Sequence, residues 1–190
     1  MGRFAKDTGG QDFQQAPAGT HVAICIQIID IGTHHGEYQG TPTVKNQVVI
    51  RWELPNEKMD DGQPFIVSAF YTNSLSEKSK LRPMLEAWRG RPFSEQELAG
   101  FDLQAILGKA CMLNIISDNN RAKVSSVMAL PKGMTVPPVH NKCKAFWIDE
   151  WDQAEFDDLP KGFQAMIMKS DEFKSRGGNV RPAVEENIPF

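Results

Sequence analysis

The sequence contains no apolar run of about 18 residues, which is the length that a membrane-spanning helix needs. Its first 17 residues are polar and rich in Gly and Gln, and they lack the cationic and then apolar layout of a secretory signal. The three cysteines, Cys25, Cys111 and Cys143, are an odd number at scattered positions, so a disulfide framework is not expected. Together these absences predict a cytoplasmic protein without a membrane segment.

Patterns typical of metal centres and enzymes are also missing. His140 and Cys143 have the spacing H-x2-C, but no second ligand pair at a suitable spacing completes a tetrahedral set. The chain has no Walker loop, no G-x-S-x-G, no H-E-x-x-H and no Cys/His signature of a deaminase. We therefore expect no cofactor, no metal and no catalysis. One alternative is a nuclease that holds Mg²⁺ through acids such as Glu53, Glu57, Asp60 and Asp61.

The net charge of −3 is unevenly distributed along the chain. Residues 1–148 have a small excess of Lys and Arg, whereas residues 149–190 have an excess of Asp and Glu. Such an uneven charge is found in proteins that have a nucleic-acid-binding core and an acidic tail. An ordinary solvated surface explains it about as often.

Apolar alternation predicts five strands, because side chains on a strand point to opposite faces in turn. The strands are expected at Thr20–Gly32, Val44–Leu54, Phe65–Thr72, Cys111–Ile115 and Arg121–Leu130. A polar loop with several glycines is expected at 32–42, and turns are expected around Asp60–Gly62 and Ser117–Asn120.

Two helices are expected between the third and fourth strands. The spacing of Leu81, Met84, Leu85 and Trp88 has the period of a helix, and Gly90 is placed as its C-terminal cap. Ser94 and Glu97 have the spacing of a capping box at the start of a second, short helix. The Trp side chains at 52 and 88 fall on the apolar faces, so both are predicted in the core.

This order of elements predicts a mainly β protein, an OB-like five-stranded Greek-key barrel with a helical insert between strands three and four. The barrel would occupy residues 18–148, and a generic α+β sandwich is the alternative. Residues 149–174 would form an acidic segment and a helix that begins near Pro160, presents Phe163, Met166 and Ile167, and packs against the barrel. Residues 1–17 and 175–190 are expected to be flexible.

Single-strand binders combine a cationic groove for phosphates with aromatic faces for bases. On an OB barrel the strand crosses strands two and three, between the loop that joins strands one and two and the loop that joins strands four and five. Mapping this surface and the basic residues near the first helix gives these candidates: Tyr38, Lys45, Arg51, Phe70, Tyr71, Lys78, Lys80, Arg82, Arg89, Arg91, Arg121 and Lys123. Phe70 is the first choice for stacking and Tyr71 the second, with ordinary core packing as the alternative for both rings. The basic set near the helix is predicted to rim the groove, or to be a solvated face.

The last residues of the chain carry a second kind of site. Glu185 and Glu186 precede Ile188, Pro189 and Phe190, and this ending resembles the C-terminal tip of bacterial single-stranded DNA-binding proteins. A terminal Phe joins a ring and an α-carboxylate, so a pocket that is apolar and basic at its rim can bind both, while upstream acids steer the approach. The resemblance implies recruitment of replication and repair proteins. The usual tip has more carboxylates, and Asn187 interrupts the acidic run here.

A longer segment resembles small phage-encoded proteins that are thought to bind single-stranded DNA. The matching stretches are 71–81, 88–91, 101–103 and 107–109, and the likeness extends over about residues 18–130. It implies a role in phage replication, recombination or repair inside a bacterial host. The predicted function is therefore a non-enzymatic single-stranded DNA-binding protein. The alternatives are the Mg²⁺-dependent nuclease and a phage adaptor or inhibitor that binds only host proteins.

Overall fold

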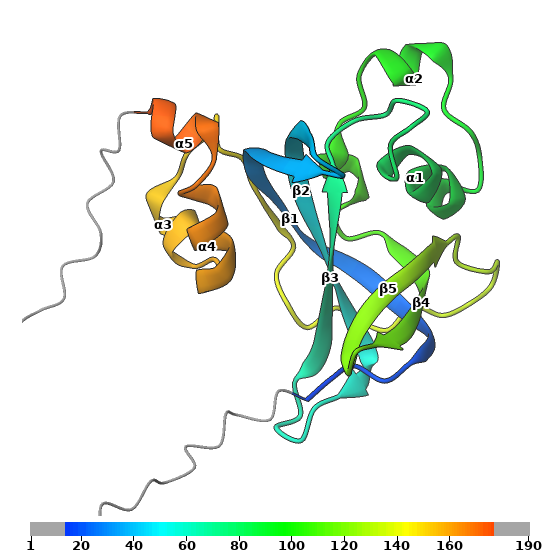
Figure 1. The fold of residues 1–190 in the computed structure, drawn as a ribbon. Coiled ribbons are helices and arrows are strands. Elements are labelled where there is room, and N and C mark those ends of the chain that lie inside the picture. Colours follow the sequence, from blue (N-terminus) through cyan, green and yellow to red (C-terminus); the bar gives the residue numbers. More distant parts are fainter. Residues whose placement is uncertain (1–13, 177–190) are drawn as a thin grey trace, which may run out of the picture.

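A computed structural model describes residues 14–176, and their fold is mainly β (Figure 1). The strands are β1 (Gly19–Tyr38), β2 (Thr41–Lys58), β3 (Pro64–Thr72), β4 (Ala110–Asp118), β5 (Arg121–Met128) and β6 (Lys144–Phe146). The helices are α1 (Leu81–Arg89), α2 (Glu95–Ala99), α3 (Gln153–Asp157), α4 (Lys161–Ile167) and α5 (Asp171–Ser175), with a 3-10 turn at Leu103–Ile106. All five predicted strands are therefore present, and β6 is an addition that the apolar alternation did not indicate.

The strands form one sheet in the order β3-β2-β1-β4-β5, with antiparallel pairing throughout, and β6 pairs with β1 in parallel. β3 and β5 are the two ends of this order, so hydrogen bonds do not close the sheet between them. Beyond the end of β5, the N–H of Ala129 donates to the carbonyl of Ala87 in α1 (3.0 Å). The mainly β prediction is confirmed, whereas barrel closure is not.

The sheet carries an apolar core on each face, and helices cover both (Figure 1). On one face, Trp52 packs against Trp88 of α1 with ring centroids 6.0 Å apart, and both side chains are buried as predicted. On the other face, Ile29, Val49 and Phe146 pack under α3 to α5. The part of β1 within residues 23–32 is buried because it lies at the centre of the order between the two cores, with Ile28 in one and Ile29 in the other.

The predicted loop at 32–42 is wrong, because β1 and β2 continue through it as a long hairpin. Their pairing runs to Tyr38 opposite Thr41. Gln39 and Gly40 make the turn with φ angles of 50° and 75°, the left-handed values that a tight hairpin turn requires. Apart from the exposed Tyr38 and Val44, the large side chains of this extension are polar, so the sequence shows no apolar alternation there. We call its outer part, residues 33–46, the hairpin arm.

The local helix signals are confirmed. The hydroxyl of Ser94 accepts from the N–H of Glu97, and the Glu97 carboxylate accepts from the N–H of Ser94, which completes the capping box. Gly90 ends α1 with φ of 69°. Both signals depend on residues close in sequence, so no tertiary information is needed to find them.

The C-terminal region does pack on the sheet, but not as the single helix that was predicted from Pro160. Pro160 is the N-cap of α4, and Ser170 caps a separate α5 by accepting from the N–H of Phe173. α3 lies inside the acidic segment, where Phe156 is buried against Trp151 and Phe146. The apolar face is also narrower than expected, since Met166 is exposed.

Some residues at the ends that were predicted to be flexible belong to the fold. Ala16 is buried in the core, and the Gln15 side chain accepts from the N–H of Ala122 in β5 (2.9 Å). At the other end, Ser175 belongs to α5, and Arg176 donates to the carbonyl of Ile148 (2.8 Å). Residues 1–13 and 177–190, which include the C-terminal tip, lie outside the described residues. Within residues 14–176, no helix is long and apolar enough to cross a membrane.

Candidate nucleic-acid interface

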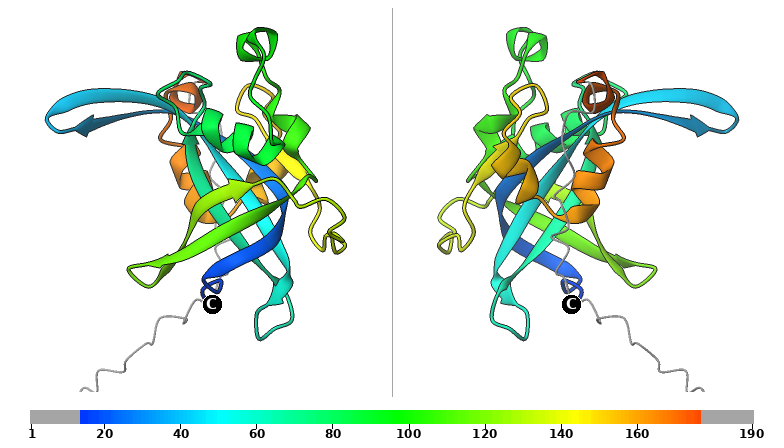
Figure 2. Two further views of the ribbon diagram at one scale, coloured as in Figure 1. Left: turned by 90° about the vertical axis from the view of Figure 1, so that its right-hand side faces the viewer. Right: turned by 90° about the vertical axis from the view of Figure 1, so that its left-hand side faces the viewer.

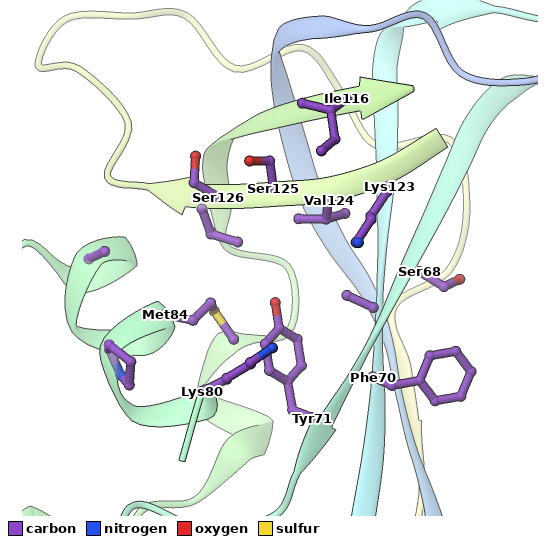
Figure 3. A pocket seen from close by; sticks show the side chains of 14 residues that line it. Ser68, Phe70, Tyr71, Lys80, Met84, Ile116, Lys123, Val124, Ser125 and Ser126 are labelled. Atoms are coloured by element: carbon purple, nitrogen blue, oxygen red, sulfur yellow. The ribbon is translucent and has the colours of Figure 1, made fainter. Parts of the chain in front are cut away.

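A groove of about 750 Å³ lies where β3 and β5 face each other without pairing, and α1 forms one of its walls (Figure 3). It is lined by Ser68, Ala69, Phe70, Tyr71, Lys80, Pro83, Met84, Ala87, Ile116, Lys123, Val124, Ser125, Ser126 and Val127. We call this cavity the β3–β5 groove. It combines apolar walls, hydroxyl groups and two cations, and none of these lining residues is acidic.

Tyr71 supplies the aromatic surface of the β3–β5 groove, and its side chain points into the cavity (Figure 3). The ring packs against the core below, which fixes its position. Burial raises the pKa of Tyr71 to about 12, and the nearby Cys111 adds to the increase. The phenol therefore stays protonated at neutral pH and offers a hydroxyl donor beside the ring.

Lys80 and Lys123 bring positive charge to the same cavity from separate elements. Lys80 is the exposed N-cap of α1, Lys123 lies on β5, and both side chains reach toward the groove (Figure 3). The ammonium of Lys123 pairs with the Asp118 carboxylate (3.0 Å), and both side chains are about half exposed. An exposed pair of this kind is worth little, so a phosphate can replace the carboxylate at small cost.

Phe70 is exposed as predicted, at 47% of its surface, but its ring is turned away from the cavity (Figure 3). The ring lies 6.1 Å from the ring of Phe163 in α4, on the other side of β3 from Tyr71. Successive residues of a strand face opposite ways, so only one of the two neighbours can enter the groove. Of the two predicted stacking residues, Tyr71 is therefore the one whose ring faces the groove.

Arg51 was predicted on an open face of β2, and the structure corrects this. Its guanidinium donates to the Gln27 side chain (2.5 Å) and lies 5.6 Å from the ring centroid of Phe163, under α4. Burial lowers its pKa. Arg51 lies on the face of β2 that was predicted to be open, but the C-terminal helices cover this face at Arg51.

Three further arginines do not rim the β3–β5 groove. Arg82 pairs with Glu86 one turn along α1 (3.2 Å), while Arg89 and Arg91 both pair with Glu97 of α2. Local carboxylates thus hold this part of the predicted basic set, and none of the three lines the groove. Lys78 is exposed in the segment before α1 and does not line the groove either.

Tyr38, Lys45 and Arg121 are exposed at the two hairpins. Tyr38 and Lys45 lie on the hairpin arm, and Arg121 begins β5 beside the turn at Asn119 and Asn120. Both hairpins project to the same side of the molecule (Figure 2). These are the two loops that were expected to flank the strand, but their side chains do not line the β3–β5 groove.

The acids considered for Mg²⁺ take other positions. The buried Glu53 carboxylate accepts from the N–H groups of His140 (2.7 Å) and Asn141 (2.8 Å), and Glu57 pairs with His21 (3.1 Å). Within residues 14–176, no three His, Cys, Asp or Glu side chains are grouped as metal ligands.

Several lining residues were missed from the sequence, among them Met84, Ile116, Val124, Ser125 and Ser126. Ile116 is 41% exposed, but it is one of several exposed apolar side chains, so its exposure alone does not mark a site. The others become visible only when α1 and β5 are known to face each other.

No family model matches the chain, and no curated protein matches it either.

Proposed function

We propose that this protein is a non-enzymatic single-stranded DNA-binding protein with an OB-like fold, and that it holds the strand in the β3–β5 groove. The observation that carries the proposal is the meeting of Tyr71, Lys80 and Lys123 in one cavity, from three separate elements. Residue type supports the same proposal, because an aromatic ring and two cations are the groups that a single strand requires.

The lining of the groove suits unpaired nucleotides. Lys80 and Lys123 attract phosphates, which displaces counterions and makes affinity fall with salt. The Tyr71 ring and the apolar side chains of Met84, Val124 and Ile116 offer faces to bases, which are accessible only when they are not paired. The hydroxyls of Ser125 and Ser126 add donors that do not depend on sequence. Binding without sequence preference follows from this combination.

The second part of the proposal concerns the C-terminal tip. Glu185, Glu186, Ile188, Pro189 and Phe190 would recruit host replication or repair proteins, while the groove coats and protects exposed strands. This would take place in the bacterial cytoplasm during phage replication, recombination or repair. The resemblance of the tip to that of bacterial single-stranded DNA-binding proteins, and of residues 18–130 to phage proteins that are thought to bind single strands, supports this setting.

The test is a fluorescence anisotropy titration of a labelled thymidine oligonucleotide and of duplex DNA at two salt concentrations. Wild type should prefer the single strand, and its affinity should fall with salt. The variant with Lys80→Ala and Lys123→Ala should bind about tenfold or more weakly at low salt, and its log–log salt slope should be shallower by about 2. Lys132→Ala, in an exposed turn outside the groove, is the matched control and should behave as wild type.

The rival functions give different results in the same experiment. Cleavage of the oligonucleotide in Mg²⁺ that a chelator abolishes would establish a nuclease. A protein that retains no oligonucleotide at low salt would be an adaptor that binds only proteins. Equal weakening by Lys132→Ala would mean that general charge, and not the groove, is responsible.

A further inference from the structure

A second cavity, of about 390 Å³, is lined by residues from the end of α1, from α2 and from the 3-10 turn. Its walls include the ring of Phe101, the buried Trp88 and the apolar side chain of Ile106. Its charged groups are Arg89, Arg91, Lys109 and Glu97. We call it the α1–α2 pocket. Its lining shares no residue with that of the groove, so the two are separate sites.

The charges of the α1–α2 pocket do not balance, because three cations face one carboxylate. Glu97 accepts from both arginines, and its contact with Arg91 is a fork with distances of 2.8 and 3.1 Å. The Lys109 ammonium is exposed, and among residues 14–176 it has no hydrogen-bonded or ionic partner. An anion entering the pocket would therefore meet an excess of positive charge.

Arg89 gives a second indication of a ligand. Its guanidinium lies 4.3 Å from the ring centroid of Phe93 and 5.3 Å from that of Phe101, and the side chain is only 14% exposed. Its Nη1 is buried and has no acceptor in the described part of the chain. A buried N–H of a charged group without an acceptor is costly, and a negative charge in the pocket beside this guanidinium would reduce that cost.

We propose that the α1–α2 pocket binds a nucleotide, with the phosphate at Lys109, Arg91 and Arg89 and the base against Phe101 and Ile106. A nucleotide joins a flat apolar ring to an anion, and the pocket offers both kinds of surface side by side. The nucleotide is either free or part of the strand held in the β3–β5 groove. Binding of a free nucleotide does not depend on the proposed function, whereas binding of a nucleotide of the held strand does.

The test is an NMR titration of the full chain with dTMP, compared with thymidine and with inorganic phosphate. The Trp88 indole N–H donates to the Ala110 carbonyl at the edge of the pocket (3.0 Å), so its resonance reports local occupancy. dTMP should shift this resonance and the Lys109 amide saturably. Thymidine and phosphate should each require at least about tenfold higher concentrations, because each lacks one half of the contacts.

Variants locate the binding. Lys109→Ala should raise the Kd for dTMP about threefold to tenfold. Its fold is not at risk, because the contacts of Lys109 with Ile106 and Cys25 are made by the main chain. Arg91→Ala should weaken binding similarly. Lys80→Ala in the groove should leave it unchanged, which separates failure of this proposal from failure of the proposed function.

Three outcomes would overturn the proposal: no saturable shift, a phosphate response equal to that of dTMP, or shifts confined to the β3–β5 groove. A short thymidine oligonucleotide identifies the source of the nucleotide. Competition with dTMP would place a nucleotide of the strand in the pocket, whereas undisturbed dTMP binding would make it a site for free nucleotides. Both results uphold a nucleotide site.

Discussion

At the scale of single residues, adjacent positions on β3 face opposite environments. Tyr71 enters the β3–β5 groove, and Phe70 lies toward Phe163 of α4. Polarity alone favoured Phe70, since the strand phase that contains Ser68 and Thr72 looks solvent-exposed. That phase is indeed exposed at Phe70, but its ring is turned toward α4, and the ring of Tyr71 on the other phase points into the groove.

The two rings should therefore respond differently to removal. Tyr71→Leu keeps apolar volume but deletes the aromatic face, so oligonucleotide affinity should fall by about tenfold, within the usual range for one stacked base. Phe70→Leu should leave affinity within about twofold of wild type. Anisotropy titrations measure both, and circular dichroism verifies that each variant is folded. The reverse order of effects would place the strand on the α4 side of β3.

The position of Gly32 in β1 requires glycine because of the backbone conformation and of the residues around it. Its φ is 76°, it forms part of an irregularity in β1, and a Cβ there would lie 2.6 Å from Ser170 Cβ and from the Glu172 carboxylate. α5 therefore docks against bare backbone at this point.

Gly32→Ala should lower the free energy of unfolding by about 2 to 3 kcal/mol, because the backbone is strained and α5 must move. Urea unfolding followed by fluorescence gives the value. Gly36→Ala is the control, since its Cβ would meet only Thr43 Oγ1 at 3.4 Å and its φ is not positive. If the two variants lose equal stability, the close approach of α5 is not what requires glycine at 32.

At the scale of elements, the hydrogen bonds of Glu97 join α1 to α2. The carboxylate closes the capping box with Ser94 and accepts from Arg89 and Arg91. The bonds from Arg91, the Ser94 N–H and Arg89 lower the pKa of Glu97 to about 2. The folded protein therefore binds this proton more weakly than the unfolded chain does.

It follows that Glu97 stabilises the fold above the ordinary glutamate pKa of about 4.3, and that this contribution is lost as the pH falls toward 2. Glu97→Gln keeps the shape of the side chain but cannot titrate. The difference in unfolding free energy between wild type and this variant should be constant above about pH 5 and shrink toward zero near pH 2. Urea unfolding across this range measures it. Glu95→Gln, on an exposed residue of the same helix, is the control variant.

The elements also show what the sequence could predict. The five strands, α1 and the capping box follow from local patterns, and the structure has them all. The hairpin arm has no apolar face to detect, and three-residue β6 is too short to show a period. Of the residues predicted for the site, Tyr71, Lys80 and Lys123 line the β3–β5 groove. The position of Arg51 depends on a long-range contact with Phe163, which the sequence does not reveal, and Arg89 and Arg91 pair with the nearby Glu97.

At the scale of the whole molecule, the acidic C-terminal region has two parts. Residues 149–176 belong to the fold, since Phe156, Leu159 and Ile167 bury their side chains against the sheet and Arg176 is fixed to Ile148. Residues 177–190 follow, and they carry Glu185 and Glu186 before the terminal Phe190. A truncation that tests the tip should therefore begin after Arg176, because a cut further upstream would remove contacts of the fold itself.

Deleting residues 177–190 should leave oligonucleotide affinity equal to or higher than that of wild type, because the two glutamates repel phosphates and compete for Lys80 and Lys123. Phe190→Ala should keep oligonucleotide affinity unchanged and abolish capture of host replication or repair proteins, since the ring is lost from the tip. Anisotropy measures the effect of the deletion on oligonucleotide affinity, and pull-down from host extract measures the effect of Phe190→Ala on partner capture.

Each prediction has a contrary outcome. A large loss of DNA affinity on deletion would mean that the tail contacts the strand. Capture by Phe190→Ala equal to wild type would place the partner surface elsewhere in the chain.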